Sequence, residues 1–175
     1  MATNTIFLDR DGVINKEINY LYRKDDFEFI DGIFDACRYF ESIGYNIIII
    51  TNQSGIARGF YTEDEFKLLT NWMLSKFIDQ RINILDIFYC PHGPKFNCEC
   101  RKPKPGLFLM AQKKYDIDMS KSWMIGDKEG DIKAANNAGI EKTILVRSGH
   151  PIDESRSKST KIIDSIKDSI NIIID

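Results

Sequence analysis

The sequence has few of the features that mark several common protein classes. It contains two histidines, His92 and His150, which leaves little material for a catalytic Ser-His-Asp arrangement. No G-x-x-x-x-G-K-[ST] segment is present, which excludes nucleotide hydrolysis by a Walker-type phosphate loop. Apolar runs such as Ile47–Ile50 are far too short to cross a bilayer. The net charge is −2, so the protein lacks the excess of basic residues that nucleic-acid binding by bulk charge requires.

The amino-terminal stretch "MATNTIFLDRDG" has neither a basic region nor a long apolar segment, so we expect no signal peptide. With 43% hydrophobic and 29% charged residues, the composition is that of a globular protein. The 175 residues suffice for one domain with a sizeable core. We therefore expect a monomeric, cytoplasmic protein with a single domain over residues 1–175. In that compartment cysteines are usually free or bound to a metal.

Short apolar runs alternate with longer amphipathic segments along the chain. The clearest helix runs from Thr62 to about Gln80, because Thr62 and Glu65 form a capping-box pattern before an apolar stripe. Strands separated by helices predict an α/β fold of three layers with a mostly parallel central sheet. The expected strands are Thr5–Leu8, Asn46–Ile50, Ile84–Tyr89, Ser122–Ile125, Lys142–Val146 and Lys161–Ile163. Further helices are expected from Ile33 to near Gly44, over Gly106–Tyr115 and Gly130–Ala138, and along Ile166, Ile170 and Ile173. The polar segment Ser148–Thr160 is expected to be a mobile surface loop.

Polar side chains directly follow three of the expected strands. Asp9 and Asp11 come after the first strand, residues 51–54 after the second, and residues 126–128 after the fourth. In open parallel sheets, ligands bind beyond the carboxyl ends of the strands. We therefore expect these three clusters to meet on one rim of the sheet.

The residue types on this rim favour phosphoryl transfer. Carboxylates that share a site repel one another unless a cation lies among them, and oxygen ligands without histidine suit Mg²⁺. Arg101, Lys102 and Lys128 could neutralise an anion on the other side. Carboxylates, a hard metal and phosphate-binding donors together indicate a phosphatase with a carboxylate nucleophile.

Four motifs in order resemble those of the haloacid-dehalogenase-like (HAD-like) phosphatases: "FLDRDG", "ITNQSG", "CRKPKPG" and "MIGDKEGD". The resemblance covers Ile6 to about Arg147. Within that superfamily, "TNQSGIARG" and "YCPHGP…CECRKPKPG" are similar to the D-glycero-D-manno-heptose 1,7-bisphosphate 7-phosphatases. The resemblance implies a Rossmann-like HAD fold. The chain between Asp11 and Thr51 has room for one loop and one helix, so we expect no large cap domain.

The resemblance also implies roles for individual residues. Asp9 would be the nucleophile that forms an aspartyl-phosphate, and Asp11 would protonate the leaving sugar oxygen and then take a proton from water. We expect metal contact to keep Asp9 ionised and its repulsion to raise the pKa of Asp11. Thr51 and Lys102 would bind the transferring phosphoryl oxygens. Mg²⁺ would be held by the carboxylate of Asp9, the backbone carbonyl of Asp11 and Asp127. The substrate-binding residues would be Glu17, Ile18, Asn19, Tyr20, Asn52, Gln53, Ser54, Arg101 and Lys128.

The segment "CPHGPKFNCEC" supplies Cys90, His92, Cys98 and Cys100. One histidine and three thiolates within eleven residues are enough for a closed tetrahedral zinc site, although incidental reduced thiols would show the same spacing. The resemblance includes this loop and implies a structural zinc site at residues 90–100. Such a site would fasten the segment that carries Arg101 and Lys102 to the rim.

These observations lead to one hypothesis and two alternatives. The hypothesis is a Mg²⁺-dependent phosphatase that removes the 7-phosphate of a small-molecule heptose bisphosphate, in nucleotide-heptose synthesis for bacterial surface polysaccharide. The same chemistry on histidinol phosphate is the first alternative, and a non-catalytic zinc-loop binding module is the second. Asp131 and Arg58 could each serve the site or be ordinary surface residues. His150 is expected at the surface.

Overall fold

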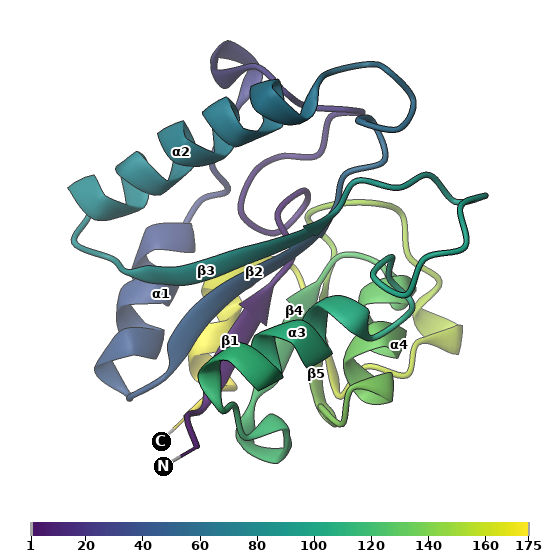
Figure 1. Ribbon diagram of the computed structural model, residues 1–175. Helices are drawn as coiled ribbons and strands as arrows, with labels where there is room; N and C mark the ends of the chain where they lie inside the picture. The colour runs from purple at the N-terminus through teal and green to yellow at the C-terminus, as the bar shows by residue number, and fades with distance from the viewer. Residues whose placement is uncertain (1, 175) are drawn as a thin grey trace.

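The computed structural model describes residues 2–174, which build one six-stranded parallel sheet with helices on both faces (Figure 1). The strand order is β3-β2-β1-β4-β5-β6, and every neighbouring pair is parallel. The predicted α/β fold is thereby confirmed. The strands are β1 (Thr5–Leu8), β2 (Asn46–Asn52), β3 (Ile84–Cys90), β4 (Trp123–Gly126), β5 (Lys142–Val146) and β6 (Lys161–Ile163).

Alternating side chains of the central strand supply two separate cores. Ile6 and Leu8 point to one face of the sheet, and Phe7 points to the other. The first face packs against α1 (Ile33–Ser42) and α2 (Glu63–Asp79), while α3 (Gly106–Tyr115) and α4 (Glu129–Asn137) cover the second. All four residues of β1 are fully buried, as a strand covered on both faces must be.

The strand order reverses at β1, and this reversal fixes the place of the site. The chain leaves β1 toward β2 on one side, and the later strand β4 adds on the other side. Crossovers in opposite directions leave a crevice beyond the carboxyl end of such a strand, where ligands bind in open parallel sheets. Asp9 is the first residue past this end.

Two segments differ from the sequence-based expectation. The last predicted α-helix is a 3-10 helix over Ile166–Asn171, in which Ile166 is buried and Ile170 is exposed. A 3-10 helix has three residues per turn, so Ile170 does not lie on the same face as Ile166, as it would in an α-helix with 3.6 residues per turn. Residues 148–160 lie at the surface as expected, but they include a short 3-10 helix over Glu154–Arg156 and are anchored by hydrogen bonds. Ser157 and Lys158 donate to the carboxylate of Glu129, and the backbone N–H of Thr160 donates to Thr143.

No helix within residues 2–174 is long and apolar enough to cross a membrane.

The capping box of α2 gives a direct test of what stabilises this helix. Thr62 Oγ1 accepts the N–H of Glu65 at 3.1 Å, and Glu65 Oε2 accepts the N–H of Thr62 at 2.7 Å. We expect Thr62→Ala to lower the free energy of unfolding by about 1 kcal/mol, because the backbone N–H of Glu65 loses its acceptor. Urea denaturation measures this change. Thr62→Ser, which keeps the hydroxyl, should stay near wild type; equal losses in both variants would contradict the capping role.

Candidate active site

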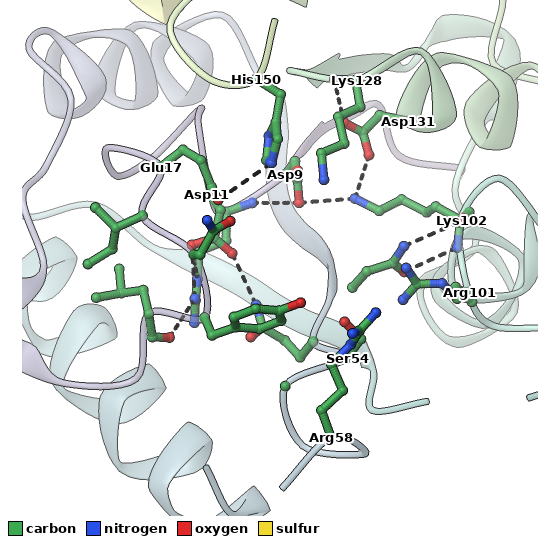
Figure 2. Close-up of a pocket in the computed structure, with 18 of the residues that line it drawn as sticks. Asp9, Asp11, Glu17, Ser54, Arg58, Arg101, Lys102, Lys128, Asp131 and His150 are labelled. Carbon is green, nitrogen blue, oxygen red and sulfur yellow. Dashed lines mark hydrogen bonds and ion pairs between the residues drawn. The ribbon is translucent and has the colours of Figure 1, made fainter. Parts of the chain in front are cut away.

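Asp9 lies almost fully buried at the end of β1, at the floor of a pocket (Figure 2). Its Oδ1 accepts hydrogen bonds from the backbone N–H of Arg10 at 2.9 Å and from Nζ of Lys102 at 3.0 Å. Burial raises the pKa of Asp9 well above its ordinary value, and repulsion from Asp131 and Asp127 adds to this, while Lys102 opposes it. The ionised form of Asp9 therefore depends on positive charge beside the carboxylate.

Lys102 provides part of that charge from the strand-to-helix segment before α3. Its ammonium group contacts Asp9 at 3.0 Å, Oδ1 of Asp131 at 2.7 Å and the carbonyl oxygen of Ile50 at 2.9 Å. Burial by itself would lower the pKa of Lys102, but the attraction of Asp131 and Asp9 outweighs it and raises the pKa. All three acceptors use the lysine's three N–H donors, so the ammonium group is held in one place.

Asp131 supports this arrangement from the first turn of α4. Its Oδ2 accepts the backbone N–H groups of Asp127 and Lys128, each at 3.1 Å, while its Oδ1 pairs with Lys102. The side chain is only 3% exposed. Asp131 is thus a buried member of the site. The alternative interpretation, that Asp131 is an ordinary surface residue, is wrong.

Asp127 follows β4 and brings a third carboxylate to the same point. One oxygen each of Asp9, Asp127 and Asp131 lie within 4.8 Å of one another. Burial and then repulsion from Asp131 raise the pKa of Asp127 to about 6. Among the described residues, its buried Oδ1 has no hydrogen-bond partner. A free carboxylate oxygen in a crowded anionic cluster fits a hard divalent cation, which would replace repulsion by attraction.

Asp11 takes a different environment from Asp9. Its carboxylate accepts four N–H groups: Nε and Nη2 of Arg10, Nδ2 of Asn15 and Nε2 of Gln53, at 2.9–3.2 Å. The Arg10 side chain is 2% exposed and also donates to the carbonyl oxygen of Leu21. The sequence did not reveal these contacts, which place three of the four donors on Oδ1 and one on Oδ2.

Thr51 and Gln53 connect β2 to this network. Gln53 Nε2 donates to Thr51 Oγ1 at 2.9 Å, and Gln53 Oε1 accepts the hydroxyl of Tyr61 at 2.5 Å. Tyr61 fits here because Gly55 has no side chain: a Cβ at that position would lie 2.2 Å from the tyrosine ring. Thr51 itself is buried beneath the pocket rather than lining it.

The pocket collects residues from segments far apart in the sequence. All nine residues expected to bind substrate line it, as do Asp9, Asp11 and Lys102. The pocket is also lined by Arg58, whose role the sequence left open, by His150, which was expected at the surface, and by Arg10, Leu21, Gly55 and Tyr61, which no sequence pattern singled out. His150 lies in a polar segment without periodicity, so no local pattern could place it here.

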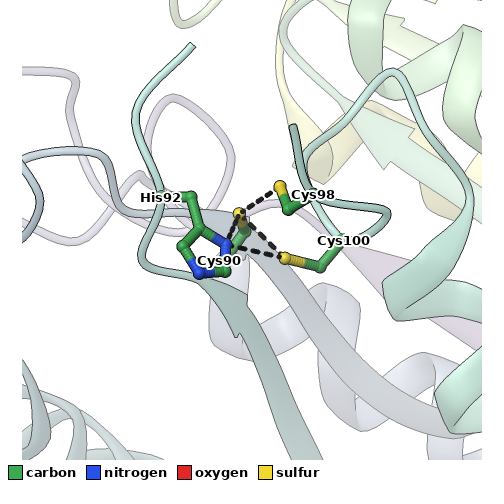
Figure 3. Close-up of side chains that lie close together, drawn as sticks. All are labelled: Cys90, His92, Cys98 and Cys100. Carbon is green, nitrogen blue, oxygen red and sulfur yellow. Dashed lines mark hydrogen bonds between the residues drawn. The ribbon is translucent and has the colours of Figure 1, made fainter. Parts of the chain in front are cut away.

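The cysteine cluster, whose four side chains lie together in Figure 3, begins at the carboxyl end of β3 and is a separate group from the three carboxylates. The Sγ atoms of Cys90 and Cys100 are 3.1 Å apart, those of Cys90 and Cys98 are 3.7 Å apart, and Nδ1 of His92 is 3.3 Å from Cys100. Donors from the backbone of Arg101 and from neighbouring side chains outweigh burial and lower the pKa of Cys98 to about 6. The four ligand atoms lie within 4.8 Å of one another, which suits a closed zinc site.

The cluster is tied directly to the pocket. Nη1 of Arg101 donates to the carbonyl oxygen of His92 at 3.3 Å. Asn52 then clasps Lys102 on both sides: its Nδ2 donates to the lysine carbonyl at 3.2 Å, and its Oδ1 accepts the lysine N–H at 3.1 Å. The position of Arg101 thus depends on the loop, while Lys102 has independent anchors.

Comparison with known proteins agrees with this site. The HAD-hydrolase-like family model matches residues 99–169. D-glycero-alpha-D-manno-heptose-1,7-bisphosphate 7-phosphatase of Photorhabdus laumondii is 48% identical over 155 residues, 85% of either chain. The corresponding beta-anomer enzyme of Vibrio cholerae is 46% identical and covers 96% of this chain and 95% of its own.

A solved structure extends the likeness to three dimensions. The D,D-heptose 1,7-bisphosphate phosphatase of B. bronchiseptica, complexed with magnesium and phosphate, superposes with a TM-score of 0.85, at 28% identity and 97% coverage of both chains. The expected resemblance is therefore confirmed by sequence and by fold. The chain belongs to the D-glycero-D-manno-heptose-1,7-bisphosphate 7-phosphatase family of the HAD-like hydrolases.

Proposed function

We propose that this chain hydrolyses the C7 phosphate ester of D-glycero-D-manno-heptose 1,7-bisphosphate, with Mg²⁺ as catalytic cofactor. The observation that carries the proposal is the buried Asp9 carboxylate, held by Lys102 beside Asp127 at the floor of an open pocket. Relatives named for this reaction match nearly the whole chain, which supports the substrate class.

In the first proposed step, a carboxylate oxygen of Asp9 attacks phosphorus. A bond forms between that oxygen and phosphorus, and the bond between phosphorus and the sugar oxygen breaks. Asp11 supplies the proton that the leaving sugar oxygen takes up. Lys102 stabilises the oxygens of the transferring group, and its contacts to Asp9 and Asp131 hold it in position before substrate arrives.

In the second step, Asp11 accepts a proton from a water molecule that attacks the aspartyl-phosphate. The bond between Asp9 and phosphorus then breaks, which releases inorganic phosphate and restores both carboxyl groups. In the described arrangement Arg10, Asn15 and Gln53 all donate to Asp11. We propose that substrate binding draws the Asp11 side chain away from some of these donors.

Asp9, Asp127 and the backbone carbonyl of Asp11 would hold Mg²⁺, and the buried Oδ1 of Asp127, which has no hydrogen-bond partner in the described part of the chain, would serve as one ligand. When bound, the ion neutralises the carboxylates and draws electron density from the phosphoryl oxygens. Asp131 would act through Lys102 and the N–H groups of Asp127 and Lys128.

The remaining pocket residues would select the substrate. Arg101 and Lys128 line the pocket and would face the second phosphate of the bisphosphate. Residues 17–20 and 52–54 would contact the sugar, and Arg58 lines the pocket with them. A Zn²⁺ ion on Cys90, His92, Cys98 and Cys100 would fix the loop that carries Arg101.

The same proposal treats residues 1–175 as one phosphatase domain that acts as a monomer in the cytoplasm, where reduced thiolates can hold zinc. It places the reaction in nucleotide-heptose synthesis.

A substrate panel tests the proposed specificity. We expect phosphate release from a heptose 1,7-bisphosphate anomer to exceed release from histidinol phosphate by at least about a hundredfold in kcat/KM, because Arg101 and Lys128 find a second phosphate only in the bisphosphate. Steady-state phosphate assays with both anomers measure this. Dominant turnover of histidinol phosphate would contradict the specificity, and nucleic-acid binding without any hydrolysis would indicate a binding module.

Asp9→Asn tests the nucleophile. An amide is a poor nucleophile, so we expect kcat to fall by about a thousandfold or more. Circular dichroism should show a retained fold, since the substitution also removes one of the crowded buried charges. Asp153→Asn, on an exposed residue, serves as the control and should keep wild-type activity. An Asp9→Asn enzyme with near-normal kcat would overturn the mechanism.

Zinc analysis tests the cysteine cluster. We expect about one zinc per chain in the wild type and in Cys37→Ala, because Cys37 lies in the core, but little zinc in Cys98→Ser. Loss of zinc should raise KM for the bisphosphate by roughly tenfold and lower kcat less, since Lys102 keeps its own anchors. Unchanged kinetics in a zinc-free sample would refute the positioning role of this loop.

A further inference from the structure

The segment that leaves β5 folds back onto the carboxylate cluster. Ser148 Oγ donates to the carbonyl oxygen of Gly12 at 2.7 Å, which ties this segment to the turn after β1. A Cβ at Gly149 would lie 2.2 Å from Oδ2 of Asp127, and one at Gly12 would lie 2.4 Å from the same atom. Only residues without a side chain let both backbones approach the Asp127 carboxylate this closely.

His150 completes the enclosure of Oδ2. Its backbone N–H donates to Asp127 Oδ2 at 3.0 Å, and its ring Nδ1 lies 2.6 Å from the same oxygen. A carboxylate only accepts hydrogen bonds, so Nδ1 carries the hydrogen and donates it. Oδ2 is thus occupied by two donors from one residue, whereas the buried Oδ1 has no partner among residues 2–174.

The other ring nitrogen of His150 faces the substrate pocket. Nε2 lies 3.5 Å from Oε1 of Glu17, in the segment after β1 that lines the pocket (Figure 2). The ring therefore stands between a carboxylate on the β4 side and the segment expected to contact the sugar. Its side chain is 29% exposed, so it is reachable from the pocket yet held in place.

From this geometry we infer that His150 is a positioning residue for the metal ligand Asp127: its Nδ1–H fixes the carboxylate rotamer and leaves Oδ1 free for the divalent cation. The inference rests on the proposed Mg²⁺-dependent function. Groups that orient a ligand in this way typically change metal affinity by about 10- to 100-fold when removed. The backbone N–H of His150 remains in every variant, so the effect should lie toward the lower end.

The experiment measures Mg²⁺ binding to the substrate-free protein by isothermal titration calorimetry. We expect His150→Ala and His150→Gln to weaken Mg²⁺ binding by about tenfold. The amide nitrogen of glutamine reaches the position of Nε2 and not that of Nδ1. We expect His150→Asn to restore most of the affinity, because its amide nitrogen can occupy the place of Nδ1. His150→Gln also guards against a misfolded alanine variant, since it keeps the bulk and polarity of the side chain.

Kinetics supply a second readout. Raising the Mg²⁺ concentration should return the kcat of His150→Ala to within about threefold of wild type, because the weakened step is metal binding. A defect from general loosening of the fold would persist at saturating Mg²⁺.

Two results would overturn the inference while the proposed function stands. One is wild-type Mg²⁺ affinity in both His150→Ala and His150→Gln. The other is an equal loss in His150→Asn and His150→Ala, which would show that the Nδ1–H is not the cause. Wild-type protein that binds no Mg²⁺ and hydrolyses no phosphate ester would instead remove the proposed function and this inference together.

Discussion

Three carboxylates share the space beyond β1 with one lysine, and this balance of buried charge governs the rest of the site. Asp9, Asp127 and Asp131 lie close enough to share one cation, and Lys102 pairs with Asp9 and Asp131. Burying charges is costly unless each is paired and hydrogen-bonded. The lysine and backbone N–H groups satisfy Asp131 and one oxygen of Asp9, but one oxygen of Asp127 has no hydrogen-bond partner within residues 2–174. The protein alone therefore leaves the cluster incomplete, and a metal ion is the simplest completion.

The same balance explains why the supporting residues are so rigidly held. A lysine that moved away would leave Asp9 and Asp131 buried without compensation. Its position is fixed by the carbonyl oxygen of Ile50, which accepts from the ammonium group, and by the two hydrogen bonds between the Asn52 side chain and the Lys102 backbone. Packing and polar contacts therefore have to act together. The sheet fixes the positions of the carboxylates, and the segment before α3 positions the Lys102 ammonium group that compensates their negative charge.

The sequence predicts the parts of this site that depend on regular structure. Asp9, Thr51 and Asp127 could be placed on one rim because apolar strands precede them and parallel strands end at a common edge. The surroundings of Asp11 could not be predicted, since Arg10 turns back onto it through a bend rather than along a strand. His150 was missed because its contact with Asp127 joins positions 23 residues apart through an irregular segment. The final 3-10 helix was mistaken for an α-helix because isoleucines recur at spacings of three and four residues.

A phosphatase without a cap domain must restrain its substrate by other means, and here short segments around the pocket are tied to one another. Tyr20 and Phe60 approach to 4.5 Å between ring centroids, which joins the segment after β1 to the segment after β2. Arg58 lies 5.7 Å from the centre of the Tyr20 ring and adds a cation–π contact to the same junction. On the other side Arg101 is fixed by the carbonyl of His92. The pocket is thus bounded by short segments that are each tied to another element. In the proposed mechanism these contacts orient the substrate in place of a separate cap domain. Zinc would hold the loop that positions Arg101.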